Sequence, residues 1–189
     1  ENAGNFLKYA ANLLGEGGDD WDEPTCLERA GLYAVRKENP EINSIRSRWQ
    51  KDRPLAAVVF YQALVQSGNV KAVNALIKSL ERAHLNVFPV FISSLRDDFS
   101  VAALRRIFAL DPPDVSLNAT GFAAPLNAQE KLFSTLNCPV LQVIFSGGDK
   151  EDWREGSHGL AAKDIAMNIA LPEMDGRIIS RAVSFKKLE

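Results

Sequence analysis

From residue 54 onward, short hydrophobic runs alternate with segments in which hydrophobic residues recur every three or four positions. Four runs have the length of a strand: LAAVVFY (55–61), NVFPVFIS (86–93), DVSLNAT (114–120) and PVLQVIFSGG (139–148). Most of them are apolar almost throughout, rather than at every second position, which is typical of strands buried on both faces. The pattern therefore predicts parallel strands with helices on either side.

The segments between these runs carry the helical pattern, over residues 70–84, 100–110 and 127–136. We expect Asn69 and Ser100 to cap the first two helices, because such side chains accept hydrogen bonds from a helix N-terminus. The strands start about 25–31 residues apart, as in a βαβ unit, and the crossovers should be right-handed. These features predict a doubly wound, mostly parallel α/β sheet, either flavodoxin-like or Rossmann-like.

The first 53 residues do not follow this rhythm. Residues 2–14 place their apolar side chains on one helical face, which predicts an N-terminal helical extension. Glycines and acidic residues then end the helix, and the charged segment that follows leaves room for only a short helix within 38–50. We therefore divide the chain into a helical lead-in and connector (1–53) and an α/β domain (54–189).

The C-terminal segment PEMDGRIISRAVSFK contains an Asp175-Gly176 pair between two apolar runs. Asp-Gly is a strong signal for a two-residue turn, so the pair predicts a C-terminal hairpin. The chain starts with Glu rather than Met and stops at FKKLE. We therefore expect it to be an excised piece of a longer protein, with the final LE a cloning remnant.

Composition excludes several classes of function. The net charge is −2, with 22 basic and 24 acidic residues, so no basic field is available to attract nucleic acid or a membrane surface. No apolar run approaches the roughly 20 residues that span a bilayer. The two cysteines, Cys26 and Cys138, have no metal-type spacing and suggest free thiols in the cytoplasm. The sequence has neither a P-loop nor a G-x-G-x-x-G dinucleotide motif.

Polar side chains end the predicted strands, where ligands of open α/β sheets bind. Asn118 and Thr120 end the third strand, Gln142 lies in the fourth, and Ser146-Gly147-Gly148 ends it. These residues predict a polar crevice of low charge. Strand ends are also polar simply because they meet solvent, so both interpretations stay open here.

Titratable residues cluster in the last third of the chain. His158 lies in a glycine-flanked loop, and a histidine at that place is a candidate for proton transfer or metal binding. Together with Glu173 and Asp175 it would form a weak site for a divalent ion, with His158 and Glu173 as metal ligands. Trp153 lies near the predicted crevice, where it either stacks on a flat ligand or packs a helix against the sheet.

The segment IALPEMDGRIISRAVSFK (169–186) resembles the large subunit of the aerobic, ATP-dependent cobaltochelatase. The related magnesium-chelatase large subunit shares the apolar-Leu-Pro-Glu-x-Asp-Gly core but usually continues toward Pro-Ile-Val-Phe-Ala-Gly, whereas RIISRAVSFK is similar to the cobalt version. Other pieces follow in the family's order: AGLY, VVFYQALVQSGN, LNATGFA, CPVLQV and GLAAKDIAMNIALPE. One departure is Gln62, where the family commonly has Arg, and this puts in doubt any contact of that Arg with an anionic ligand.

The resemblance implies a function for the complete subunit. The family inserts Co²⁺, its substrate, into hydrogenobyrinic acid a,c-diamide during cobalamin biosynthesis. The large subunit holds this tetrapyrrole, while partner subunits of AAA+ type hydrolyse ATP, so ATP is not expected to bind this chain. The family's subunit is several times longer than 189 residues, and we expect the isolated fragment, without the rest of the large subunit, to be inactive.

The resemblance also suggests roles for individual residues. Glu173, Asp175 and His158 would accept protons and pass the metal, while side chains at five positions would bind the substrate's carboxylates and amides: Arg177, Arg181, Asn118, Thr120 and Gln142. Two alternatives remain. The chain would belong to a magnesium chelatase acting on protoporphyrin, or it would be a non-catalytic scaffold or docking module of the same subunit.

Overall fold

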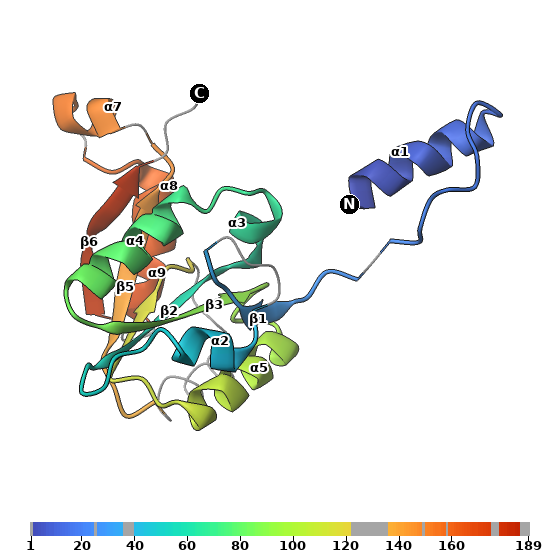
Figure 1. Cartoon of the computed structure of the whole chain (residues 1–189). Helices are drawn as coiled ribbons and strands as arrows, with labels where there is room; N and C mark the ends of the chain where they lie inside the picture. Colours follow the sequence, from blue (N-terminus) through green and yellow to red (C-terminus); the bar gives the residue numbers. More distant parts are fainter. Residues whose placement is uncertain are drawn as a thin grey trace.

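The computed structural model describes residues 2–24, 26–35, 40–121, 136–148, 150–157, 159–174 and 178–185. Within these residues, six strands form one sheet in the order β1-β3-β2-β4-β5-β6 (Figure 1). The strands are β1 (Ala30–Leu32), β2 (Leu55–Tyr61), β3 (Asn86–Ile92), β4 (Val115–Asn118), β5 (Val140–Ser146) and β6 (Ile178–Phe185).

The sheet is parallel except at one edge. β2 to β6 pair in parallel, and only the short β1 is antiparallel to its neighbour β3. Numbered among themselves, the five parallel strands have the order 2-1-3-4-5, which is the flavodoxin-like arrangement. The predicted doubly wound, mostly parallel sheet is therefore confirmed, and the strand order selects the first of its two variants.

One face of the sheet, here called the α4 face, carries α3 (Gln62–Gln66) and α4 (Lys71–Arg82). Alternate residues of β2, such as Val58 and Phe60, meet Val73 and Ile77 of α4 in a buried apolar cluster. The predicted cap at Asn69 is wrong, because the residue that precedes the helix is Val70 and no side chain caps it. Burial of the apolar stripe, rather than a cap, therefore stabilises α4.

The opposite face, here called the α5 face, carries α2 (Ile42–Arg46) and α5 (Asp98–Leu110). Its core includes Val59, Phe88, Leu104 and Ile45, all at most 5% exposed. Ser100 does not cap α5 as predicted. The cap is Asp97, whose carboxylate accepts a hydrogen bond from the backbone N–H of Ser100 at 3.2 Å.

The Asp97 cap should make stability depend on pH. Hydrogen bonds from Ser100 and Ser93 and the nearby Arg29 hold the pKa of Asp97 below its ordinary value of 3.8. A lowered pKa means that the carboxylate stabilises the fold above that value and loses this contribution as the pH falls through the pKa of the folded state. In urea unfolding, Asp97→Ala is expected to cost about 1 kcal/mol at pH 7 and less below pH 4. Asp98→Ala, which removes no cap, should cost only about 0.3 kcal/mol; equal losses would contradict the assignment.

Part of the lead-in (1–53) packs in the α/β domain and part of it does not. α1 (Asn2–Leu13) buries none of its residues and stands apart from the α/β domain (Figure 1). By contrast, β1 joins the sheet, and Ile45 of α2 lies in the core of the α5 face. The short helix expected within 38–50 is confirmed as α2, while the division of the chain at residue 53 stays a prediction.

The predicted C-terminal hairpin is wrong. The apolar run before Asp175 is helical: α8 (Ala162–Ile165), the π-helical turn η1 (Ala166–Ala170) and α9 (Leu171–Met174) follow one another. β6 then pairs in parallel with β5, which a hairpin does not allow. Pro172 lacks an N–H, but the wider η1 turn precedes it and the helix continues through it. The predicted helix at 127–136 lies almost wholly outside the described residues.

The helix α7 (Lys150–Glu155) follows β5 closely. In the described part of the chain, no helix is long and apolar enough to cross a membrane.

Candidate functional site at the carboxyl ends of the strands

Three polar residues predicted at strand ends come together in the structure. Asn118 donates from Nδ2 to Gln142 Oε1 at 2.9 Å, and Thr120 donates from Oγ1 to Asn118 Oδ1 at 2.9 Å. Gln142 Nε2 donates to the carbonyl oxygen of Thr120, also at 2.9 Å. All three residues are 0% exposed. The network joins β4 to β5 and fixes the backbone that leaves β4; a role of its side chains toward a substrate stays a prediction.

The turning point of the sheet lies beside this network. Chain connections leave β2 and β4 in opposite directions, and such a point forms the ligand crevice of open α/β sheets. Here the Tyr61 hydroxyl donates to the carbonyl oxygen of Gly121 at 2.8 Å and bridges the two strand ends. A Cβ atom on Gly121 would lie 3.1 Å from the carbonyl oxygen of Met167, so glycine lets η1 approach closely. The Gln62 amide donates to the carbonyl oxygen of Glu28.

A buried carboxylate lies at the end of β5. Asp164 of α8 is 8% exposed and accepts hydrogen bonds at Oδ2 from Ser146 Oγ at 2.7 Å and from the backbone N–H of Gly147 at 2.9 Å. Ser146 Oγ in turn accepts from the N–H of Gly148 at 3.1 Å. Two donors thus fix the orientation of this carboxylate beside Ser146.

A cavity of about 440 Å³ opens next to this carboxylate. Trp153 and Ile165, each 42% exposed, and Leu160 give it an apolar wall, while Ser146 and Gly148 form its polar end. A broad apolar wall with a few polar groups is the usual lining of a small-molecule site. Trp153 is therefore partly exposed at this cavity, and its stacking on a flat ligand stays a prediction.

Of the other predicted residues, the structure separates Glu173 from this crevice. Ile178, the first residue of β6, pairs with Leu141 near the start of β5, whereas Ser146 is the last residue of β5. The start of β6 therefore lies at the amino edge of the sheet. The helix α9, which carries the exposed Glu173, directly precedes β6 and lies at the same edge. Arg181 belongs to β6. His158, Asp175 and Arg177 lie outside the described residues. Glu173 thus does not meet Asn118, Thr120 or Gln142, and its catalytic role stays a prediction.

Among the described residues, no group of three His, Cys, Asp or Glu side chains forms a metal site. The metal site predicted from His158 and Glu173 stays a prediction, because His158 lies outside the described residues. Cys26 and Cys138 are free, as expected. Burial raises the pKa of the Cys138 thiol above its ordinary value, and the Asp114 carboxylate raises it further, so this thiol is a poor metal ligand at neutral pH.

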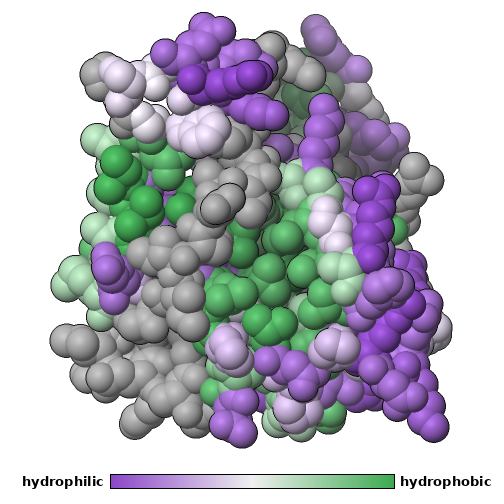
Figure 2. Space-filling view, turned by 90° about the vertical axis from the view of Figure 1, so that its left-hand side faces the viewer, coloured by the Kyte–Doolittle hydropathy of each residue, from purple (hydrophilic) through white to green (hydrophobic). Residues whose placement is uncertain are grey.

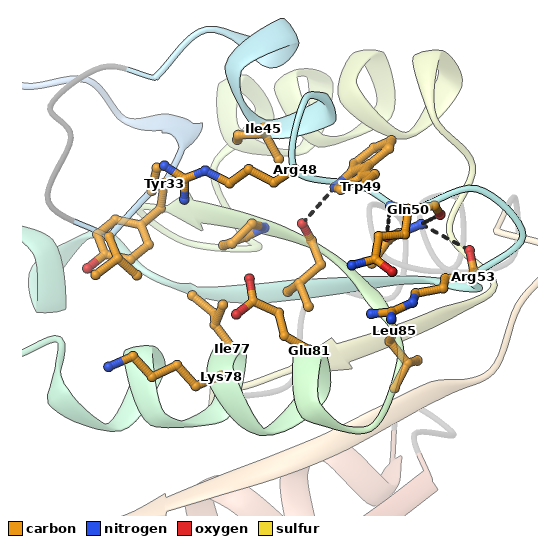
Figure 3. Close-up of a pocket in the computed structure, with 15 residues that line it drawn as sticks. Tyr33, Ile45, Arg48, Trp49, Gln50, Arg53, Ile77, Lys78, Glu81 and Leu85 are labelled. Atoms are coloured by element: carbon orange, nitrogen blue, oxygen red, sulfur yellow. Dashed lines mark hydrogen bonds between the residues drawn. The ribbon is translucent and has the colours of Figure 1, made fainter.

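A second cavity, of about 410 Å³, lies at the start of β3 and carries Arg48, Arg53, Lys78 and Glu81 (Figure 3). Trp49 at its rim donates from Nε1 to the carbonyl oxygen of Val87 at 3.2 Å. This hydrogen bond ties the connector to the edge of the sheet. Because the cavity lies away from the carboxyl ends of the strands, it is less suited to bind the substrate.

Sequence reasoning missed Asp164 and Tyr61 as members of the site. Asp164 lies 18 positions from its partner Ser146, and no short motif joins them. Its only local signal is an acidic residue in the first turn of a helix, which the helix dipole alone explains. Tyr61 was noted only as the end of a strand.

Comparison with known proteins identifies the family. The profile described as CobN/Magnesium Chelatase matches residues 1–189. The chain is 43% identical to the aerobic cobaltochelatase subunit CobN of Sinorhizobium sp over 98% of its length, and 33% identical to that of Pseudomonas aeruginosa over 100%. It spans about 15% of the length of each.

A solved structure shows the same fold. The catalytic subunit of cobaltochelatase from Mycobacterium tuberculosis matches 98% of this chain with a TM-score of 0.72 and 23% identity, over 16% of its own length. Because the family profile matches the chain from its first residue to its last, the protein belongs to the CobN/magnesium chelatase family.

Proposed function

We propose that this chain is a segment of the tetrapyrrole-binding large subunit of a cobaltochelatase. The complete enzyme inserts Co²⁺ into hydrogenobyrinic acid a,c-diamide in cobalamin biosynthesis. The observation that carries the proposal is the 43% identity to an aerobic cobaltochelatase subunit over 98% of the chain. The identity over such a length favours the cobalt enzyme over its magnesium counterpart.

The crevice at the carboxyl ends of the strands supports a role in substrate binding. Its cavity of about 440 Å³ is open and has an apolar wall at Trp153, which suits one part of a large flat ring rather than a whole corrinoid. The chain thus supplies one wall of the site, and the rest of the large subunit completes it. Partner subunits of AAA+ type hydrolyse ATP, consistent with a sequence that lacks a P-loop.

Metal insertion requires groups that accept protons from the ring nitrogens and groups that hold the ring's side chains. We assign proton transfer and delivery of the metal to Glu173, Asp175 and His158, and add Asp164 at the carboxyl edge as a further acceptor. The carboxylates of the substrate would pair with Arg177 and Arg181, because guanidinium groups bind carboxylates with two parallel hydrogen bonds. Asn118, Thr120 and Gln142 would bind its amides or hold the loop that does.

The choice of metal and ring tests the proposal. The complete large subunit and its ATPase partners are supplied with ATP and either Co²⁺ with hydrogenobyrinic acid a,c-diamide or Mg²⁺ with protoporphyrin. We expect cobalt insertion to be at least about tenfold faster, since an enzyme selects its substrates by how strongly its site binds each transition state, and the proposed site is one for Co²⁺ and a corrinoid ring. Faster magnesium insertion would replace the proposal with the magnesium enzyme.

A non-catalytic role predicts a different result in binding. If this segment only scaffolds or docks the ATPase subunits, corrinoid should not quench the fluorescence of Trp153, which lies at the cavity. Quenching that is lost in the Trp153→Leu variant supports the substrate-binding role. Unchanged quenching in that variant would exclude Trp153 from the site.

A further inference from the structure

The α4 face is apolar across β4 and β5 but is not covered there by any described helix. Alternate residues of these strands point to this face, and all five are apolar: Val115, Leu117, Leu141, Val143 and Phe145. Val115, Leu141 and Phe145 are only partly buried. The space-filling view of the side that carries β6 and α4 shows hydrophobic residues gathered in its middle (Figure 2). This patch, which also includes Leu76 and Leu80 of α4, is called the α4-side patch below.

The connectivity of the sheet explains why this face is short of helices. The crossover from β2 to β3 runs in one direction along the sheet, whereas those from β3 to β4 and from β5 to β6 run in the other. Right-handed crossovers in opposite directions pass over opposite faces. Among the connections that the structure describes, only the one from β2 to β3 therefore delivers helices to the α4 face, and α4 packs on β2 and β3.

The width of the uncovered face fits one more helix. Strands lie about 4.8 Å apart and packed helices about 8–10 Å apart, so one helix covers about two strands. With α4 on β2 and β3, a second parallel helix would lie over β4 and β5. Burial of the apolar area that Val115, Leu141 and Phe145 still expose would favour it.

We propose that a helix from the part of the longer subunit that follows β6 occupies the α4-side patch. This inference shares one premise with the proposed function, namely that the chain is a segment of a longer subunit. The premise is supported by the relatives, of whose length the chain matches about 15%. β6 is the neighbour of β5 and runs in the same direction, so it ends at the carboxyl edge. A chain leaving it there reaches the patch with a short turn and runs back beside α4.

The N-terminal helix α1 is the competing occupant within this chain, because it exposes Phe6, Leu7 and Leu13. It is attached through β1, however, which lies at the opposite edge of the sheet from β6. Its connection would have to cross the sheet, whereas sequential elements are usually neighbours. Geometry thus favours the segment after β6.

Photo-crosslinking of the complete subunit tests this placement. Phe145 is replaced by benzoylphenylalanine, an aromatic photo-crosslinker, and the cross-linked peptides are identified by mass spectrometry. We expect a cross-link to the same chain within roughly 20 residues after β6, the length of a short turn and one helix. The crosslinker at Phe99, which is 57% exposed on α5, is the control and should not reach that segment.

A cross-link from the Phe145 variant to α1, to a second copy of the subunit or to an ATPase subunit would overturn the proposal. The absence of any cross-link would also overturn it. Should the variant not fold, the crosslinker at Leu80 probes the same patch from α4. Cobalt insertion is measured on the same preparations. If the expected cross-link forms but cobalt is not inserted, only the proposed function is contradicted. If cobalt is inserted but the expected cross-link does not form, only this inference is contradicted.

Discussion

Replacing Asn118 with leucine is expected to lower the free energy of unfolding by about 2–3 kcal/mol. Leucine has the same branched shape as asparagine, with two methyl groups in place of the amide oxygen and nitrogen, but it neither donates nor accepts a hydrogen bond. Gln142 Oε1 then loses the amide that donates to it at 2.9 Å, and Thr120 Oγ1 loses its acceptor at 2.9 Å. All three residues are 0% exposed, so water does not replace the lost bonds without rearrangement. Urea unfolding monitored by tryptophan fluorescence measures the change.

A double substitution separates the lost hydrogen bond from a simple misfit. Replacing Asn118 with leucine and Gln142 with methionine removes both partners of one bond, and the combined loss should be about 1 kcal/mol smaller than the sum of the single losses. Strict additivity would mean that the two amides are not coupled. Because the network fixes the loop after β4, we also expect weaker corrinoid binding in the single variant of the complete subunit.

The parallel sheet was predictable because strands buried on both faces leave nearly continuous apolar runs. β2, β3, β4 and β5 all lie within the predicted runs, offset by at most a few residues. β1 was missed because three residues among charged neighbours carry no periodic signal. The order of the strands was not predictable, since pairing between distant segments depends on the whole sheet and not on local pattern.

The C-terminal error has a local cause. The Asp175-Gly176 pair is a genuine turn signal, and it predicted a hairpin. Packing of η1 on the loop at Gly121 favours a continuous helix instead, and the helix carries the chain back to the amino edge.

The candidate site was predicted only in part, because local sequence pattern reveals where strands end but not which distant elements meet. Asn118, Thr120 and Gln142 were found because strand ends can be located in a sequence and because their polarity stands out among apolar neighbours. Asp164 was not, because its meeting with Ser146 depends on how α8 packs against the end of β5. A contact between elements that are distant in the sequence follows no fixed spacing of residues, so it cannot be predicted from the sequence pattern.

In the complete subunit, replacing both Glu173 and Asp175 with alanine is expected to slow ATP-dependent cobalt insertion by about a hundredfold or more. A proton acceptor acts when the ring loses its protons, so its removal slows insertion without weakening the binding of the ring. Corrinoid affinity should therefore stay within about threefold of the unaltered subunit. Both quantities are measured on the same preparations, insertion by the absorbance of the cobalt product and affinity by tryptophan quenching.

Two comparisons make this result specific. Glu173 is exposed, so its loss should not unfold the domain, and Glu81→Ala removes another exposed carboxylate, from α4, as a control. Asp164→Asn tests the carboxyl edge, where the buried carboxylate meets Ser146 and Gly147. If insertion falls with Asp164→Asn but not with the Glu173 and Asp175 double variant, proton transfer occurs at the carboxyl edge and not beside α9. If only the double variant slows insertion, the reacting face of the ring lies toward the amino edge, and the crevice at Trp153 holds the ring's periphery.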